Sequence, residues 1–559
     1  MRRILSISIM LALMTLCRVI AGAAASRTLS ENDLLKLLAG GVYNARIALL
    51  VRDRGINFVP TAHDLVLLQH AGANEALLHE VMTAPRVLPQ VMQHPPQPPR
   101  QRHVTPPSVN QVIVPIGHNA LDVRQAASNS SKPSLSIPSQ QSLNSKLAAS
   151  SSAAGTLPVG TRITIWNWQK YAQYMPLGMR ELFEGHHFWK MPADIAMVIG
   201  PTTSEKMPAG YNEATKRYSR NVEIVHLPDG HNDIRNYMGG EPFPHPIEPD
   251  KGYKLLADLW FAYVPHLLAG TSENPLTICS ETDYHNMNCE QLSYVYRQVA
   301  YNTDGGASAE ELKGSDYWYT EWLSVEEPEE LRYTTLLTLY PKDNQRQKEL
   351  FKFVPSLRRW FRGSLAAACS PVVGTDYSED DFKRVGFNGG LGSFNANFLG
   401  HRQIIALSGD YTPLGGDFPA NYYMPLGWPE PSWGNWQLRN VDVVDVRRIP
   451  SEQAGYCYGK RIIYEDSQTH YALWEDVYDK NMQLWKTALL AQRIVNVRPL
   501  GGVPGAFTST AWDLKNRHLT NASTQSKRGR DVLIDDDIPA QYRNYVAYST
   551  PAGLADIMK

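Results

Sequence analysis

The acidic stretch GTDYSEDDF, residues 374–382, is the densest group of side chains that could do chemistry. Its carboxylates belong to Asp376, Glu379, Asp380 and Asp381. Oxygen ligands of this type suit a calcium ion. However, Ser378 precedes Asp381 by three residues, which is the spacing of a helix cap, and acidic residues in a first turn complement the helix dipole. We therefore favour helix capping over a calcium site.

No established catalytic motif accompanies these acids. The sequence contains no nucleophile elbow, phosphate-binding loop or zinc-binding helix motif. The adjacent side chains of His186 and His187 diverge on a helix or a strand, so they do not predict a shared metal ion. Hydrolysis through Asp376 or Asp381 stays an alternative, although no base or nucleophile stands out. We predict a protein that is not an enzyme and has no cofactor or bound metal.

Three arginines in the segment FKFVPSLRRWFRG form a second candidate site. Arg358, Arg359 and Arg362 are interleaved there with Trp360 and Phe361. Guanidinium groups bind carboxylates and phosphates through two parallel hydrogen bonds, so this cluster could clamp a lipid headgroup. The alternative is that the arginines pair with internal acids and hold strands together.

A run of aromatic strands provides the main scaffold for any site. The pattern predicts three strands in a meander, at 461–465, 471–478 and 483–492. In the second strand Tyr471 and Leu473 lie on one face and Trp474 lies on the other. A sheet with aromatic side chains on both faces either packs on both sides or lines an apolar cavity.

The N-terminus and the overall charge limit the classes of function. Arg2 and Arg3, the apolar run from Ile4 to Cys17 and the small residues before Ser26 predict a secretory signal peptide over residues 1–25. We therefore expect a periplasmic protein. Lys and Arg number 54 against 55 Asp and Glu, so no basic surplus exists for a nucleic-acid partner.

Four cysteines follow the predicted signal peptide: Cys279, Cys289, Cys369 and Cys457. An even number in an oxidising compartment predicts disulfides, with three alternative connectivities. Cys279 and Cys289 flank the polar loop SETDYHNMN, which suits a bridge between neighbouring strands, so we predict that they pair. A metal site is the alternative.

Changes in composition divide the chain. We predict a helical module at 29–84 with helix starts at Ser30 and Thr61, and a disordered Pro/Gln/Ser-rich linker at 85–156. The main domain follows at 157–519 and a polar surface arm at 520–559. Within the main domain, 250–268 reads as one amphipathic helix that carries Trp260. Further strands are predicted at 292–301, 331–340, 402–407 and 441–448.

Six motifs in order resemble a known family: PAGYNEATKRYSRN, GGEPFPHP, FVPSLRRWFRG, GTDYSEDDF, KRIIYED and YDKNMQLWK. Residues 157–519 are similar to the exported proteobacterial domain of unknown function 1329. The resemblance implies an α+β fold like that of the LolA/LolB lipoprotein carriers. That fold is a large, strongly curved antiparallel sheet, an open half-barrel with plugging helices, joined here to a small N-terminal all-α module. It implies no catalytic residues.

The leading hypothesis is a periplasmic, non-catalytic carrier or binding protein for a lipid or another hydrophobic small molecule. The predicted lining residues are Trp260, Tyr471, Leu473, Trp474 and Trp485. Relatives of this type imply an outer-membrane protein or an efflux-type transporter as partner. The alternative is a structural or assembly partner of an outer-membrane complex, with the helical module as its contact.

Overall fold

The computed structural model describes residues 28–39, 44–71, 73–86, 157–282, 286–304, 315–363, 369, 371–372, 375–381, 386–409, 418–434, 436–497, 500–525 and 531–556. The predicted signal peptide lies outside these residues, as does the predicted linker apart from its first two residues. The chain divides into two units, residues 1–149 and 150–559, which are described separately.

The described residues of the first unit form four short helices: α2 (Glu31–Ala39), α3 (Asn44–Arg54), α4 (Ala62–His70) and α5 (Glu75–Thr83). Both predicted helix starts are confirmed. The Ser30 hydroxyl accepts from the Asp33 backbone N–H at 3.1 Å, and the Asp33 carboxylate accepts from the Ser30 backbone N–H at 2.9 Å. Thr61 and Asp64 form the same reciprocal capping box. Buried apolar side chains such as Leu34, Ile47 and Leu77 make up the core of this module.

Within the described residues, sixteen strands of the second unit form one sheet. Its main path is β11 (Arg359–Arg362), β10 (Glu349–Val354), β9 (Thr335–Pro341), β8 (Tyr317–Glu327), β7 (Asn286–Gln298), β6 (Leu276–Thr282), β21 (His518–Ser523), β20 (Gly501–Asp513), β19 (Leu484–Val497), β18 (Ala472–Asp479), β17 (Tyr458–Asp466), β16 (Gln437–Arg448) and β12 (Phe394–Ala406). All neighbours on this path are antiparallel. β5 (Leu267–Gly270) joins β7 and β22 (Leu533–Ile534), and β13 (Ser408–Gly409) pairs with β19.

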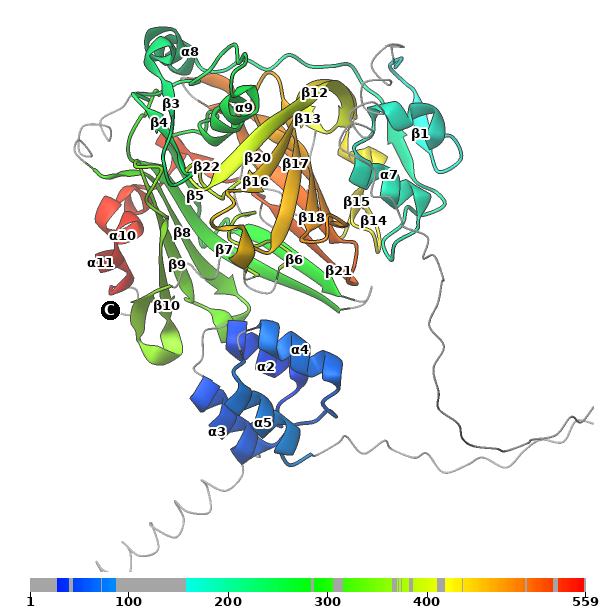
Figure 1. Ribbon diagram of the computed structural model, residues 1–559, viewed down its shortest axis with the longest axis vertical. Helices are drawn as coiled ribbons and strands as arrows, with labels where there is room; N and C mark the ends of the chain where they lie inside the picture. Colours follow the sequence, from blue (N-terminus) through cyan, green and yellow to red (C-terminus); the bar gives the residue numbers. More distant parts are fainter. Residues whose placement is uncertain are drawn as a thin grey trace, which may run out of the picture. The chain divides into compact units, whose positions relative to one another are not determined.

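The sheet stays open, as the predicted fold class requires. In the part of the chain that the structure describes, the end strands β11 and β12 do not pair with each other. The three strands of the predicted meander are confirmed as β17, β18 and β19, with Trp474 opposite Leu489 in the register. Figure 1 follows the sheet from the green strands β6–β10 to the yellow and orange strands β12–β21.

One face of the sheet is covered by α9 (Lys251–Trp260), so the expectation of a plugging helix is confirmed. Leu255, Leu259 and Trp260 of α9 pack with sheet residues such as Tyr294 and Val444 in one buried cluster, which we call the α9-side core. The predicted single helix over 250–268 is wrong. The helix ends at Trp260 and β5 begins at Leu267, because Pro265 disfavours helical geometry in the residue before it.

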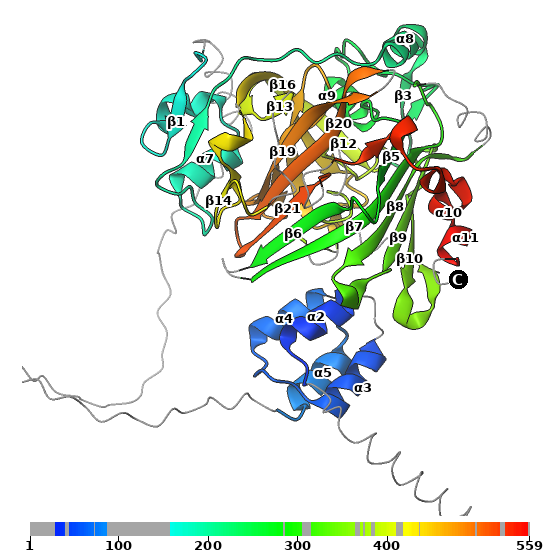
Figure 2. The same ribbon diagram turned by 180° about the vertical axis from the view of Figure 1, so that it is seen from behind.

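The opposite face is covered in two places. Near β16–β20, the 3-10 helix η1 (Trp168–Tyr174), α7 (Leu177–Glu184) and the hairpin β14 (Tyr422–Tyr423) with β15 (Trp428–Pro429) form the α7-side core. Figure 1 places α7 beside β1, β14 and β15, and Figure 2 shows it beside β1 and β14 from behind. Near β7–β10, α10 (Tyr545–Ser549) and α11 (Pro551–Leu554) cover the sheet (Figure 2).

The C-terminal segment corrects the prediction of a polar surface arm at 520–559. β21 lies inside the sheet between β6 and β20. Further on, Ile538, Tyr542 and Leu554 are buried against β7–β10. The prediction failed because the apolar residues are few and widely spaced among polar ones, yet each is directed into the core.

Short elements complete the second unit. They are the pair β1 (Arg162–Thr164) and β2 (Ala196–Val198), helix α8 (Ala209–Tyr218), the hairpin β3 (Glu223–His226) with β4 (Asn232–Arg235), and the 3-10 helices η2 (Ser219–Asn221), η4 (Glu329–Leu331), η5 (Pro355–Leu357), η8 (Pro431–Trp433), η9 (Gln453–Gly455), η10 (Asp535–Asp537) and η11 (Ala540–Arg543). The pair β1–β2 bears on function because Ile165, which follows β1, lines the open cleft described below.

Candidate functional site

Among the described residues, four of the five predicted lining residues are packed in the core. Trp260, Tyr471, Leu473 and Trp474 are each at most 7% exposed. The cavity beside Trp260 is lined by aromatic side chains including Tyr237, but its volume is only about 20 Å³. Such a volume holds about one water molecule. Aromatic side chains of the protein itself fill the concavity in this structure.

These residues also belong to opposite faces of the sheet. Trp260, Tyr471 and Trp485 contact the α9-side core, whereas Leu473 and Trp474 belong to the α7-side core. The expected alternation of side chains fails at the start of β18, because the register shifts between Trp474, opposite Tyr464, and Ala472, opposite Glu465. Leu473 lies at this irregularity and contacts the same core as Trp474, so the prediction that Leu473 shares a face with Tyr471 is wrong. The five residues therefore do not form one site in this structure.

The three arginines lie on the hairpin β10–β11 at one end of the sheet. Arg358, Arg359 and Arg362 are exposed, and Arg362 pairs with Glu349 at 3.4 Å. Exposed charges on an end strand hinder pairing with another chain. The clamp on a lipid headgroup stays a prediction.

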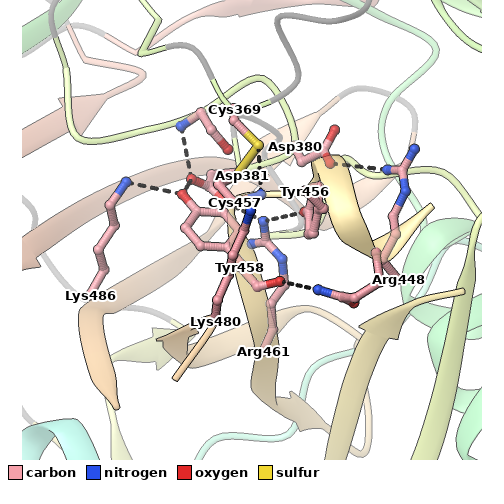
Figure 3. Close-up of a disulfide and its surroundings, with 12 residues drawn as sticks. Cys369, Asp380, Asp381, Arg448, Tyr456, Cys457, Tyr458, Arg461, Lys480 and Lys486 are labelled. Atoms are coloured by element: carbon pink, nitrogen blue, oxygen red, sulfur yellow. Dashed lines mark hydrogen bonds and ion pairs between the residues drawn. A yellow bond between two sulfur atoms is a disulfide. The ribbon is translucent and has the colours of Figure 1, made fainter. Parts of the chain in front are cut away.

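The acidic stretch forms a buried ion network in place of a helix cap. Ser378 to Asp381 form a turn, and Asp381 pairs with Arg461, which also donates to Glu475 at 2.9 Å. The Tyr458 hydroxyl donates to Asp381 at 2.7 Å. Figure 3 shows this network beside the disulfide. The capping prediction is wrong. The Ser378 N–H does donate to the Asp381 carboxylate at 2.8 Å, but the two residues close a turn, and the same carboxylate pairs with Arg461 of β17.

The network holds charge within the core. Burial opposes ionisation of Asp381, but the Arg461 guanidinium and Lys486 hold its pKa below the usual value. Burial raises the pKa of Glu475 to about 7, despite the same arginine. Arg461 is 1% exposed, so its guanidinium group is shielded from solvent. We therefore assign this network to stability.

Two disulfides are present. Cys279 and Cys289 face each other across β6 and β7, with Cα atoms 4.0 Å apart. Cys369 and Cys457, whose partners the sequence left open, join with Cα atoms 5.7 Å apart beside the ion network (Figure 3).

An open cleft lies at the edge of the α7-side core, and its volume is about 520 Å³. It is lined by Ile165, Trp168, Gln169, Phe183, Glu184, Gly185, His186, Lys190 and Met191. Trp168, Phe183 and Met191 are buried and Ile165 is half-buried, so they make an apolar floor. The polar members are exposed and form the rim. This volume lies within the usual range for small-molecule sites.

A close backbone contact holds α7, which forms one wall of the cleft. The Gly178 N–H donates to Asp476 Oδ1 on β18 at 3.1 Å. A Cβ at this position would overlap the Thr487 side chain and the Asp476 carboxylate. The close approach of α7 to β18 and β19 therefore requires glycine. At the C-terminal end, Gly185 adopts φ 71° and ends the helix.

Three groups of histidine and carboxylate side chains in the described residues are close enough to hold a metal ion. They are Glu181, Glu184 and His186 at the rim of the cleft; His266, Asp304 and Asp535; and Glu241, Asp258 and His470. In the first group Glu184 and His186 are exposed. His187, the other member of the predicted histidine pair, contacts Glu181 at 3.0 Å.

The chain matches the family described as protein of unknown function (DUF1329) over residues 162–554, which includes the cleft and the whole sheet. It is a member of the DUF1329 family. The match extends beyond the predicted boundary at residue 519, in agreement with the position of β21 inside the sheet. No curated protein matches this DUF1329 sequence.

Three solved structures resemble the DUF1329 chain at low identity. A putative outer membrane lipoprotein-sorting protein domain from Vibrio parahaemolyticus has 12% identity and a TM-score of 0.35, over 53% of this chain and 96% of its own. A DUF1329 family protein from Desulfovibrio piger has 12% identity and a TM-score of 0.36, over 54% and 100%. A LolA superfamily protein from Nitrosomonas europaea has 13% identity and a TM-score of 0.29, over 50% and 89%. Because these TM-scores lie below 0.5, the functional argument depends on the site itself.

Sequence reasoning missed the cleft of this DUF1329 protein. Its floor comes from a stretch that reads only as partly helical, and Phe183 and Met191 resemble ordinary core residues. One usable signal is the closely spaced pair Trp166 and Trp168, because Trp168 lines the cleft. Among the described helices, none is both long enough and apolar enough to cross a membrane.

Proposed function

We propose that this DUF1329 protein is a non-catalytic, periplasmic binding or carrier protein for a lipid-like molecule, which occupies the open cleft. The observation that carries the proposal is the 520 Å³ volume above an apolar floor. The cleft thus takes the place of the filled concavity beside Trp260. In this account the protein delivers its cargo to or from transport machinery of the cell envelope.

The chemistry of the cleft favours a molecule with an apolar body and a polar end. Ile165, Trp168 and Met191 offer hydrocarbon, aromatic and thioether surface, while Lys190 and His186 lie at the rim. Each 40 Å² of apolar ligand surface that the floor buries would contribute about 1 kcal/mol before ordering costs. An acidic headgroup would meet the Lys190 ammonium at the solvent boundary.

Binding without catalysis is the simplest use of these groups. The lining residues include no serine, threonine or cysteine that could act as a nucleophile. The titratable lining residues Glu184, His186 and Lys190 are exposed. Catalytic acids and bases commonly depend on burial and on specific partners for their altered pKa values.

The proposal is tested by replacing Ile165 with Asp, which puts a charge into the apolar floor. We expect the Ile165→Asp protein to bind an apolar fluorescent dye at least 10-fold more weakly than the wild type, and to yield less lipid on solvent extraction and mass spectrometry. Val159→Asp is the matched control, because Val159 is 66% exposed and is not a lining residue. Equal binding by Ile165→Asp and wild type, or a wild type that carries no lipid and shifts no dye, would contradict the proposal.

A further inference from the structure

A buried group of carboxylates and one histidine lies on the α9 side of the sheet. One ligating atom from each of Glu241, Asp258 and His470 lies within 4.8 Å of the others. They come from the segment after β4, from α9 and from the turn between β17 and β18. Distant parts of the chain thus converge at one point, and Glu465 of β17 joins them through His470.

His470 is held between two carboxylates. Its Nδ1 lies 2.7 Å from Glu465 Oε1, and its Nε2 lies 3.0 Å from Glu241 Oε1. The backbone of His470 has φ 60°, a conformation that costs energy for a non-glycine residue. This strained backbone conformation places the imidazole between the two acids.

Two carboxylate oxygens of the group have no hydrogen-bond partner among the described residues. These are Asp258 Oδ2 and Glu465 Oε2, on side chains that are 0% and 1% exposed as residues. The other oxygen of Asp258 accepts from the Phe243 backbone N–H at 2.8 Å. A buried carboxylate oxygen without a partner is costly, so it indicates an additional ligand.

Acidic side chains outnumber basic ones in this group. Glu241, Asp258 and Glu465 supply three carboxylates against the single imidazole of His470. In the described part of the chain, no lysine or arginine forms a hydrogen bond or an ion pair with any of the four. By contrast, Arg461 accompanies Asp381 and Glu475 in the buried network near the disulfide. A divalent cation would place positive charge beside these carboxyl groups.

The spacing of Glu241 and His470 fits metal coordination. Two ligand atoms about 2.1 Å from an ion and at right angles are about 3.0 Å apart, which is the Glu241–His470 distance. A metal-bound histidine usually donates its second ring N–H to a carboxylate, and Glu465 is placed to accept it. One nitrogen and two carboxylates, without sulfur, suit Zn²⁺ or Mn²⁺ better than Ca²⁺, which prefers oxygen ligands alone.

We propose that Glu241, Asp258 and His470 form a binding site for a divalent transition-metal ion, with Glu465 as the positioning residue for His470. The ion would tie α9 to the sheet and to the segment after β4. Side-chain exposures of 19% for Glu241 and 11% for His470 leave a route from solvent. This site is separate from the cleft and does not depend on the proposed function.

The test is metal binding by the purified chain after treatment with EDTA. We expect one Zn²⁺ per chain by calorimetry and elemental analysis, with no displacement by Ca²⁺. Glu241→Gln and Asp258→Asn should weaken Zn²⁺ binding at least 100-fold, and Glu465→Gln 10- to 100-fold. His231→Gln is the matched control, because His231 also lies between two carboxylates, Asp229 and Glu452. Its Zn²⁺ affinity should equal that of the wild type.

Stability provides a second readout if a variant folds poorly. Zn²⁺ should raise the midpoint of thermal unfolding of the wild type and of His231→Gln, and should leave Glu241→Gln unchanged. The proposal is overturned if the EDTA-treated chain takes up no Zn²⁺, or if Glu241→Gln binds as tightly as the wild type. In that case His470 is simply an imidazolium held between two carboxylates.

Discussion

The aromatic concavity beside Trp260 and the cleft beside Trp168 differ in their free volume. Both are lined by large apolar side chains, but the first has about 20 Å³ of free volume and the second about 520 Å³. In the concavity, Trp260 packs against Trp318 with ring centroids 5.6 Å apart. In the cleft, Phe183 packs against Trp168 at 5.7 Å and the space above them stays open.

The difference shows that aromatic content alone does not indicate a binding site. In the concavity α9 and the strands approach closely enough for their side chains to interdigitate, which is the normal density of a core. Beside α7, the chain turns away at Gly185 and leaves the floor uncovered. Stability should therefore depend on the α9 side, and ligand binding on the cleft.

The largest expected effect is on the buried network of the α9 side. Replacing Arg461 with Met leaves the buried Asp381 carboxylate without its ion-pair partner, and should lower the free energy of unfolding by about 3–5 kcal/mol. Urea unfolding measures the change. The folded Arg461→Met protein should still bind dye in the cleft.

A double variant provides the control. Arg461→Met combined with Asp381→Asn removes both charges and should recover part of the lost free energy of unfolding. If the double variant is no more stable than Arg461→Met, packing of the arginine side chain accounts for the loss. If folded Arg461→Met no longer binds dye, the claim that the cleft binds ligand independently of the α9 side is wrong.

The next effect is a dependence of stability on pH. Burial raises the pKa of Glu475 from 4.5 to about 7, so the folded protein retains a proton that the unfolded chain has released. The contribution of Glu475 to the free energy of unfolding is therefore fully present below pH 4.5 and is lost as the pH rises through 7. Its size is at most about 3 kcal/mol.

The charged neighbours of Glu475 are Arg461, Asp381 and Asp476, and the pKa of Asp381 lies below its usual value. Asp381 therefore stays ionised between pH 5 and 7. Replacing Glu475 with Gln should flatten the decline of the unfolding midpoint over this pH range relative to the wild type. Parallel pH profiles for the two proteins would refute the assignment.

A smaller effect on stability, with a clear effect on binding, is expected at Gly178. Gly178→Ala places a methyl group against Thr487 and Asp476, which should push α7 outward. Overpacking of this kind costs about 1–3 kcal/mol. We expect weaker dye binding because α7 carries Phe183 and Glu184 of the cleft.

The control for Gly178→Ala is Gly455→Ala, since a Cβ at Gly455 meets no atom within 4 Å. Gly455→Ala should bind dye like the wild type. Unchanged dye binding by Gly178→Ala would show that binding in the cleft does not depend on the position of α7.

Local patterns predicted much of the fold. Alternating aromatic and β-branched residues located β17, β18 and β19, and the Ser30–Asp33 and Thr61–Asp64 spacings located two helix starts. The end of α9 was missed because the apolar pattern continues past Trp260 into β5, although Pro265 interrupts the helix.

The sites were harder to predict than the fold. Tyr471 and Trp474 looked equally suitable as lining residues, because a sequence does not say how closely an opposing helix packs. The group of Glu241, Asp258 and His470 spans more than two hundred residues of sequence, so no local spacing could identify it. A usable signal was the presence of Glu241 and Glu465 in the motifs GGEPFPHP and KRIIYED.

The most direct test of the central claim is to crosslink the protein with a fatty acid that carries a photoreactive diazirine, and to locate the labelled peptides by mass spectrometry. The account predicts labels within residues 165–191, reduced in Ile165→Asp and competed by unlabelled fatty acid. Labels concentrated in residues 211–318, around Trp260, would contradict it.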